Sequence, residues 1–498
     1  MIWILLGLPV VLIASVLGSM LYNVCLHPLR AYPGPKLWAA SRLPWIWYSC
    51  NGQVHTKILE LHKKFGGIVR IAPNELSYTT GDAWKQIYGH RSPEMMKDLR
   101  GAGILPTFKG TDSIITAAHK DHIRMRRTVA YAFSEKALRE QEHLLQGYVD
   151  LMISRLKDKC SECPQNLVNW YNWCTFDMMG DLTFAEPFGC LKEGQYHNWV
   201  RMIFDGVKAY PWVQAAVYYN LIWFVNWVTP KHLAEAKRNA DANAYAKLDR
   251  RLEKKDLNRK DFMSYILRHN DEKGLSLPEM QETAVILIIA GSETTATFLS
   301  GATYYILRHP AVYTRLVREI RHLFSNYEDI TMVKTNELKY LPAIVEETFR
   351  IYPPSPNAFP RIVPGKGEWI EGRWVPGNTT VGVNQYSASR DPRNFFEPEK
   401  FLPERWLPQS MHAGGDLPAE NFAADQKQVV QPFSFGPRNC IGRNLAYAEL
   451  QLILSKLLWT FDLQLAPDCD NGTWATKQPT YMLWEKPELN VILTPVKR

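Results

Sequence analysis

The chain has 498 residues, of which 46% are hydrophobic and 22% are charged, a balance typical of a globular protein that buries a large core. Its formal net charge of +8 is mild and is spread along the chain, which argues against nucleic acid as a partner. Eight cysteines in a chain of this length do not make a disulfide framework. Because no long linker or internal repeat divides the sequence, we expect one large domain.

The chain begins with an apolar segment, residues 2–22, that contains no charged side chain. A helix of about 21 residues spans roughly 30 Å, the thickness of the hydrocarbon core of a bilayer. Lys and Arg are absent before this segment and present within residues 30–42, so the positive-inside bias places the remainder of the chain in the cytosol. A cleaved signal peptide is the alternative, but its basic start and small-residue cleavage site are missing.

A proline-rich hinge and a small sheet are predicted next. Tyr32-Pro33-Gly34-Pro35 stiffens the chain after the anchor, because proline fixes φ and blocks continuation of a helix. Residues 68–71 and 75–78 flank Pro73-Asn74 and predict a β-hairpin. Residues 95–118 contain several glycines and predict a long loop, and helical patterns dominate afterwards.

Two helical stretches follow whose composition is unusual. Residues 122–127 include His122, whose ring can donate a hydrogen bond to a carboxylate, and Arg126; taken alone, they predict a basic, solvated helix face. Residues 210–228 contain seven aromatic side chains and, taken alone, predict buried helices.

A long helix is predicted from residue 277. Ser276 and Glu279 form a capping box, with Pro278 in the first turn, where its missing N–H costs little. The apolar pattern continues to His309, and Pro310 stops it, which gives about 32 residues and a length of roughly 48 Å. Such a helix must cross the whole domain.

The middle of this helix contains Ala290-Gly-Ser-Glu-Thr294-Thr295. Gly291 leaves space beside the helix, and the Thr294 hydroxyl can bond back to the carbonyl four residues earlier, which bends the local backbone. Glu293 adds an ionisable group next to that hydroxyl. The combination suits oxygen binding and proton delivery, although such a run is by itself usually a packing feature.

Further along, Glu347 and Arg350 stand three residues apart on a helix predicted between Pro342 and Pro353, so both lie on one face. Residues 369–383 alternate as β-strands do around Pro376-Gly377 and predict a second small sheet.

Cys440 lies just before an amphipathic helix predicted over residues 441–460. The free N–H groups and the positive end of the helix dipole favour an anion there, so the sulfur is biased towards thiolate. Gly436 and Gly442 permit a close approach of the backbone, and Arg438 can bind a carboxylate through two donors. Together these groups suit a haem iron and its propionates.

The stretch 433–442 resembles the haem-ligand loop of the cytochrome P-450 family, whose pattern is F-x-x-G-x-R-x-C-x-G. Five fixed positions match by chance on the order of 1 in 10,000 times or more rarely, whereas outside such a motif Cys440 would be one more buried thiol. Residues 290–295 resemble the family's [AG]-G-x-[DE]-T-[TS] motif, and residues 401–405 end in a P-E-R segment like the family's. The resemblance covers nearly the whole chain in family order.

The resemblance implies a role for each matched residue. Cys440 is expected to be the metal ligand, and Glu293 and Thr294 the proton-delivering pair. The residues expected to contact the cofactor are His122, Arg126, Arg361, Phe433, Gly436, Arg438 and Gly442, with His122 standing where the family usually has Trp. The residues expected to interlock as a buried structural network are Glu347, Arg350 and Arg405.

The implied fold is mainly α with two small β-sheets, preceded by one transmembrane helix. We expect an anchor over residues 1–26, a hinge over 27–45 and a haem-thiolate catalytic domain over 46–498. The cofactor is haem b (iron protoporphyrin IX), with electrons from NADPH through a diflavin reductase. A basic face formed by Arg124, Arg127, Lys136 and Arg139 is a candidate docking surface for that reductase. By family position, residues 210–228 would form the pocket roof, partly dipped in the membrane.

The expected activity is insertion of one oxygen atom from O2 into a small apolar terpenoid, polyketide or alkaloid, as in microsomal enzymes of filamentous-fungal secondary metabolism. The enzyme would be a single-pass protein of the endoplasmic reticulum membrane that faces the cytosol. Two alternatives stay open: a haem-thiolate isomerase or dehydratase that needs no reductase, against which the Glu293-Thr294 pair argues, and a haem sensor without turnover.

Overall fold

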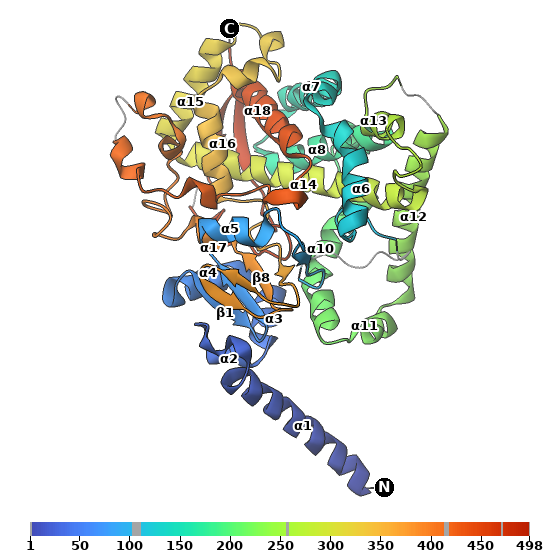
Figure 1. Ribbon diagram of the computed structural model, residues 1–498. Helices are drawn as coiled ribbons and strands as arrows, with labels where there is room; N and C mark the ends of the chain where they lie inside the picture. Colours follow the sequence, from blue (N-terminus) through green and yellow to red (C-terminus); the bar gives the residue numbers. More distant parts are fainter. Residues whose placement is uncertain (1, 102–110, 255–257, 413–417, 470–471, 498) are drawn as a thin grey trace.

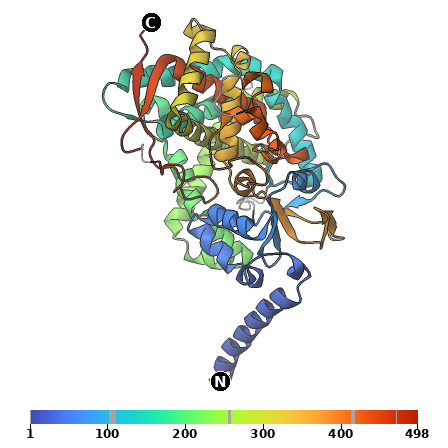
Figure 2. The ribbon, with the colours of Figure 1, turned by 90° about the vertical axis from the view of Figure 1, so that its left-hand side faces the viewer.

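The helix α14 (Leu277–Arg308) runs through the centre of the molecule and orders the helices around it. The computed structural model describes residues 2–101, 111–254, 258–412, 418–469 and 472–497. Figure 1 shows a mainly helical body from which a single helix projects at the N-terminus, and Figure 2 shows that the C-terminus lies at the opposite end.

The remaining helices are α1 (Ile2–Cys25), α2 (Lys36–Ala40), α3 (Leu43–Cys50), α4 (Val54–Phe65), α5 (Gly81–Tyr88), α6 (His119–Ala130), α7 (Glu135–Lys159), α8 (Leu167–Phe184), α9 (Cys190–Glu193), α10 (Asn198–Tyr218), α11 (Ile222–Val228), α12 (Lys231–Glu253), α13 (Phe262–Arg268), α15 (Pro310–Leu323), α16 (Tyr340–Ile351), α17 (Gln385–Ser389) and α18 (Arg443–Thr460). The strands are β1 (Ile68–Ala72), β2 (Glu75–Tyr78), β3 (Met96–Lys97), β4 (Gln165–Asn166), β5 (Arg361–Ile362), β6 (Glu368–Ile370), β7 (Arg373–Val375), β8 (Thr380–Val383), β9 (Phe461–Leu465) and β10 (Asn490–Pro495).

The ends of α14 confirm the prediction from its flanking residues. Ser276 and Glu279 exchange both bonds of a capping box, and the helix ends at Arg308, two residues before Pro310. The buried helix α8 packs along it, with a hydrogen bond of 2.7 Å between the hydroxyls of Tyr171 and Thr303. The centre of α14 is therefore held on a rigid scaffold.

The strands of the described residues form three sheets, whereas two were predicted. β1 and β2 make the expected hairpin, which belongs to a five-stranded sheet of order β1-β2-β8-β5-β3. β8 was expected in the second sheet, but it pairs in parallel with β2 because its four residues are all buried and suit a central strand. β6 and β7 pair alone, and β4, β10 and β9 form the third sheet.

The predicted hinge packs against the body. The carbonyl of Pro33 accepts a bond of 2.8 Å from the amide of Arg70 in β1, and the Tyr32 hydroxyl donates to the carbonyl of Trp374 at 2.9 Å. Helix α3 runs across the predicted division at residue 45. Strand β3 lies within the predicted 95–118 loop, of which residues 102–110 lie outside the described part.

Helix α1 projects from the body in both views (Figures 1 and 2). Its described side chains from Val10 onward are mostly exposed and apolar, and Val10–Cys25 is an apolar helical stretch shorter than a full span. Among the described helices, α14 alone is long and apolar enough to cross a membrane, but 67% of its apolar window is buried inside the protein, as in a core helix.

Candidate active site

A tight backbone turn presents Cys440 immediately before α18. The amide of Cys440 donates to the carbonyl of Phe433 at 2.8 Å, which closes the loop, while the Phe433 ring packs edge-on against Phe349. Gly436 has φ +73°, and a Cβ there would lie 1.9 Å from the carbonyl oxygen of Tyr88. Only glycine fits this position. At Gly442 an added Cβ would make ordinary contacts, 3.9 Å from Sγ of Cys440.

The thiol of Cys440 keeps accessible surface although protein atoms surround it closely, and this desolvation raises its pKa. The amide of Gly442 and the charge of Arg126 act in the opposite direction and are outweighed. The helix N-terminus, from which the sequence analysis expected a bias towards thiolate, thus does not by itself lower the pKa of Cys440 below its ordinary value. A coordinated metal removes the thiol proton outright, so ligation itself supplies the anion.

Arg126 supports this loop from α6. Its two terminal nitrogens donate to the backbone carbonyl and the side-chain oxygen of Asn439, each at 2.6 Å. His122, one turn earlier on α6, is buried beside further cations. Desolvation, then the charges of Arg438 and Lys97, lower the pKa of His122 to about 3, so its ring is neutral and keeps one N–H donor.

A cluster of buried cations surrounds one carboxylate beside the Cys440 loop. Nε of Arg438 lies 2.5 Å from Oε1 of Glu94, and Nη1 of Arg361 lies 3.8 Å from the same oxygen. Lys97 adds a third cation, although desolvation and these two arginines lower its pKa to about 7. Neither Glu94 nor Lys97 belongs to a sequence motif, so the sequence analysis missed both.

Two donors in this cluster have no hydrogen-bond partner in the described part of the chain, although they are buried: Nη2 of Arg438 and Nε of Arg361. A buried charged donor without a partner is costly and marks a place where an anion binds. The cations outnumber the single carboxylate of Glu94. Together with the accessible thiol of Cys440, the cluster fits a haem with two propionates.

The middle of α14 has the predicted backbone bond. Oγ1 of Thr294 donates to the carbonyl of Ala290 at 2.6 Å, and Ala290 is exposed although most residues of α14 are buried. The space predicted beside Gly291 is filled, however, because a Cβ there would lie 2.6 Å from Cε of Met179 on α8. The glycine is needed for close helix packing.

Glu293 makes no hydrogen bond to the Thr294 hydroxyl in the described part of the chain. Its Oε1 accepts a bond of 3.1 Å from Thr297 and forms an ion pair with the ammonium group of Lys486, while Oε2 is buried without a hydrogen-bond partner in the described residues. The sequence analysis missed Lys486, which lies 193 residues further along the chain.

The structure brings Glu347, Arg350 and Arg405 together, all with fully buried side chains. Arg350 forms two parallel bonds of 2.8 Å to the Glu347 carboxylate, and Nε of Arg405 lies 3.0 Å from Oε2 of Glu347. Asp425, which no motif indicated, pairs with Arg405 from the far side, and the amide of Leu402 and the indole of Trp406 also donate to Glu347 at 2.8 Å.

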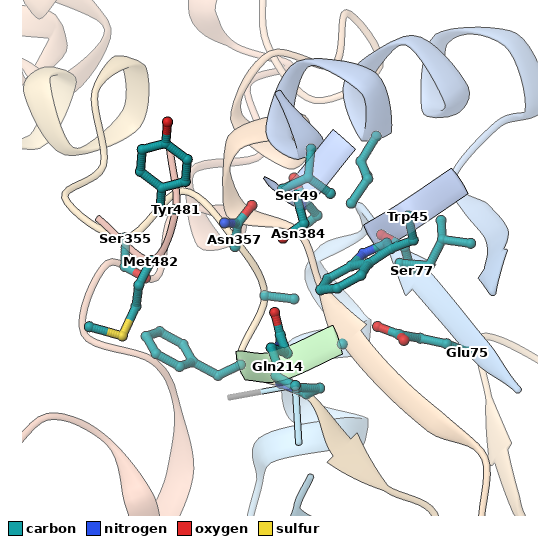
Figure 3. Close-up of a pocket in the computed structure, with 18 of the residues that line it drawn as sticks. Trp45, Ser49, Glu75, Ser77, Gln214, Ser355, Asn357, Asn384, Tyr481 and Met482 are labelled. Atoms are coloured by element: carbon teal, nitrogen blue, oxygen red, sulfur yellow. The ribbon is translucent and has the colours of Figure 1, made fainter. Parts of the chain in front are cut away.

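A pocket opens between the five-stranded sheet and α10 (Figure 3). Figure 3 shows Trp45 and Glu75 on one side and Tyr481 and Met482 on the other, with Gln214 of α10 between them. Composition alone predicted that the aromatic stretch 210–228 forms buried helices. The structure shows that only part of this stretch is buried. Tyr210 and Gln214 line the pocket, whereas the large side chains of α11 are exposed, Trp227 at 78%.

Comparison with known proteins places these features in one family. The profile of the cytochrome P450 family matches residues 33–492. The chain is 46% identical to the cytochrome P450 monooxygenase alt3 of Alternaria solani, over 99% of this chain and 94% of that protein. It is 43% identical to the cytochrome P450 monooxygenase astJ of Aspergillus oryzae (97% and 95%) and 42% identical to averantin hydroxylase of Dothistroma septosporum (96% and 89%). The chain belongs to the cytochrome P450 family and is a haem-thiolate monooxygenase that takes electrons from NADPH through a reductase.

Proposed function

We propose that this enzyme is anchored by α1 in the endoplasmic reticulum membrane and inserts one oxygen atom from O2 into a small, apolar fungal secondary metabolite, a terpenoid, polyketide or alkaloid. The observation that carries the substrate class is the pocket of Figure 3, which combines apolar side chains with a few polar groups such as Asn357 and Asn384. Relatives named as monooxygenases and a hydroxylase support the same reading.

Each group of residues in the site has its own role. Bound haem supplies the iron at which dioxygen is activated. In this proposal Cys440 is its ligand, and Arg126, Arg361, Arg438 and His122 hold the propionates, with Lys97 as a further donor. Phe433 and Gly436 close the ligand loop, and the amide of Gly442 donates to the sulfur.

Proton delivery is assigned to Glu293 and Thr294. The Thr294 hydroxyl holds a proton at Oγ1 in the middle of α14, and Glu293 is the nearest buried carboxylate along the helix. The buried network of Glu347, Arg350 and Arg405 has a scaffold role. Its described contacts include neither the Glu293 carboxylate nor the Thr294 hydroxyl.

The membrane assignment rests on exposed apolar surface. Helix α1 presents exposed valine and leucine side chains, and Figure 1 shows α11 at the same end of the body. Trp223 and Trp227 of α11 and Trp212 of α10 are exposed, and tryptophan favours the interface between lipid and water. The anchor and α11 together would rest the substrate pocket on the bilayer.

For the diflavin reductase we propose a basic face on α6 and α7. Arg127 and Arg139 are mostly exposed, and the ion pairs that they make with described residues are long, at 3.6 and 4.0 Å. Arg124, in contrast, lies 2.6 Å from Glu279 and is neutralised within the protein. Charge reversal of Arg127 and Arg139 is expected to slow reduction of the haem and weaken its dependence on salt, as measured by stopped flow.

The deciding experiment deletes the gene in its host, profiles metabolites, and incubates the accumulating precursor with membranes that contain the full chain, a diflavin reductase and NADPH. We expect a product with one atom from isotopically labelled dioxygen. Cys440→Ser should abolish it, and the matched Cys163→Ser, at an exposed thiol, should not. Conversion without NADPH would establish an isomerase or dehydratase instead, and bound haem without turnover would establish a sensor.

A further inference from the structure

Lys486 lies in the segment before β10 and reaches the centre of α14. Its ammonium group forms an ion pair with Oε1 of Glu293 and donates to Oγ1 of Thr297 at 2.8 Å. The side chains of Lys486 and Glu293 are each only 4% exposed. A lysine is rarely buried to this extent unless it is paired, so the pair is a specific feature of this interior.

The two contacts make the oxygens of Glu293 unequal. Oε1 accepts from both Lys486 and Thr297, and Thr297 lies one turn further along α14. Oε2 is buried and has no hydrogen-bond partner among the described residues. The ion pair therefore fixes which oxygen is engaged and leaves the other available to a proton.

The same segment also lines the pocket of Figure 3. Tyr481 and Met482 form one wall of it (Figure 3), and Glu485 forms an ion pair with Lys208 of α10. Residues 481–486 thus connect the pocket wall, α10 and the carboxylate in the centre of α14 within six positions. Lys486 is thus a direct contact between this segment and Glu293.

We propose that Lys486 is a positioning residue for proton delivery, which holds Oε1 of Glu293 so that Oε2 is the atom that gives and regains the proton. The ionised carboxylate first takes one proton from solvent at Oε2. It then gives that proton up towards the Thr294 hydroxyl, which releases its own proton towards dioxygen, so that Glu293 is ionised again and the ammonium of Lys486 keeps all its protons. This inference rests on the proposed role of Glu293.

The test compares Lys486→Met, which removes the charge but keeps the chain length, with Lys486→Arg in the full-length enzyme with its reductase. For Lys486→Met we expect product formed per NADPH to fall roughly tenfold and the solvent isotope effect on kcat to change. Haem content and the spectral shift on substrate binding should stay as in the wild type. Lys486→Arg should recover most of the coupling, because it retains the charge.

Lys456→Met is the matched control, since the Lys456 side chain is equally buried, at 3% exposure, and pairs with Asp150 of α7 instead of Glu293. It should leave product per NADPH unchanged. An unchanged yield in Lys486→Met would overturn the inference. An unchanged yield in Glu293→Gln would instead refute the proposed role of Glu293, so the two failures are distinguishable.

A double variant gives a readout that does not depend on turnover. Lys486→Met alone leaves the Glu293 carboxylate buried without its cation, and Glu293→Gln removes that charge. We therefore expect the thermal stability of the double variant to recover relative to Lys486→Met, and its yield of product to equal that of Glu293→Gln alone. If stability does not recover, or if the second substitution lowers the yield further, Lys486 does not act through Glu293.

Discussion

The hydroxyl of Thr295 donates a hydrogen bond of 3.1 Å to Oε2 of Glu449 and thereby joins α14 to α18 in the core. Oε1 of Glu449 is buried without a partner among the described residues. Complete burial raises the pKa of this carboxyl to about 8, and the bond from Thr295 only partly offsets the effect. Glu449 is therefore protonated in the native protein at neutral pH.

A pH dependence of stability follows for Glu449. In the unfolded chain the carboxyl ionises near its ordinary pKa of 4.5, so between that pH and about 8 the native state binds more protons than the unfolded state. Native stability thus falls as pH rises through this window, by at most about 1.4 kcal/mol per pH unit. Glu449→Gln cannot ionise, and its Tm relative to the wild type should increase from about pH 5 to pH 8. The exposed Glu420→Gln should show no such trend, and a flat difference for Glu449→Gln would refute the prediction.

Glu347→Gln is expected to cost about 3 to 5 kcal/mol of unfolding free energy, because it leaves the buried cation Arg350 without its carboxylate and Arg405 with Asp425 alone. Denaturant unfolding, with haem content as a second measure, tests this. Lys400→Ala is the control: it breaks the Glu397–Lys400 pair, which has the same spacing in sequence but is exposed. That variant should lose about 1 kcal/mol or less. Equal losses would show that the network has no special role.

Thr294→Ala should reduce product per NADPH by roughly tenfold and raise hydrogen peroxide release, because the hydroxyl that passes the proton is lost. Ser300→Ala is the control that distinguishes loss of the proton-passing hydroxyl from a change in the bend of α14. Ser300 makes the same backward bond, to the carbonyl of Ala296 at 2.7 Å, further along α14. If both variants lose coupling to the same extent, bending of the helix is the cause.

Deletion of residues 1–26 should release most of the protein from membranes while haem content is retained, since the apolar face of α1 is exposed. Residual binding to lipid vesicles is expected through α11. In the truncated chain, Trp223→Ser combined with Trp227→Ser should abolish that binding, as measured by flotation. The matched Trp369→Ser with Trp374→Ser, at the exposed β6–β7 hairpin, should not. Flotation of the truncated chain at the full-length level would contradict the anchor.

Local patterns predicted the helices well. The bounds of α14 follow from the capping box at Ser276 and from Pro310, both of which act on neighbouring residues. The β1–β2 hairpin was predicted for the same reason. The placement of β8 was missed, because its parallel partner β2 lies about 300 residues earlier and local alternation does not specify a distant partner.

The sequence predicted only the site residues that belong to short motifs. The loop at Cys440 and the position of Thr294 follow from short patterns, and the structure shows the closed loop before α18 and the backward bond of Thr294 to Ala290. Lys486, Lys97 and Glu94 carry no pattern, since each reaches the site only through tertiary packing. The raised pKa of Cys440 was missed because desolvation depends on the surrounding fold, which the helix dipole alone does not describe.

The segment after α1 is fastened to the sheet by the bond between Pro33 and Arg70 and to the β6–β7 hairpin by Tyr32. With α1 embedded as proposed, the body has little freedom to swing and keeps one orientation above the lipid. The concentration that governs turnover is then that of substrate dissolved in the bilayer rather than in the cytosol. Measured KM values would accordingly scale with the lipid-to-water ratio of the assay, and the most oil-soluble precursors would be oxidised first.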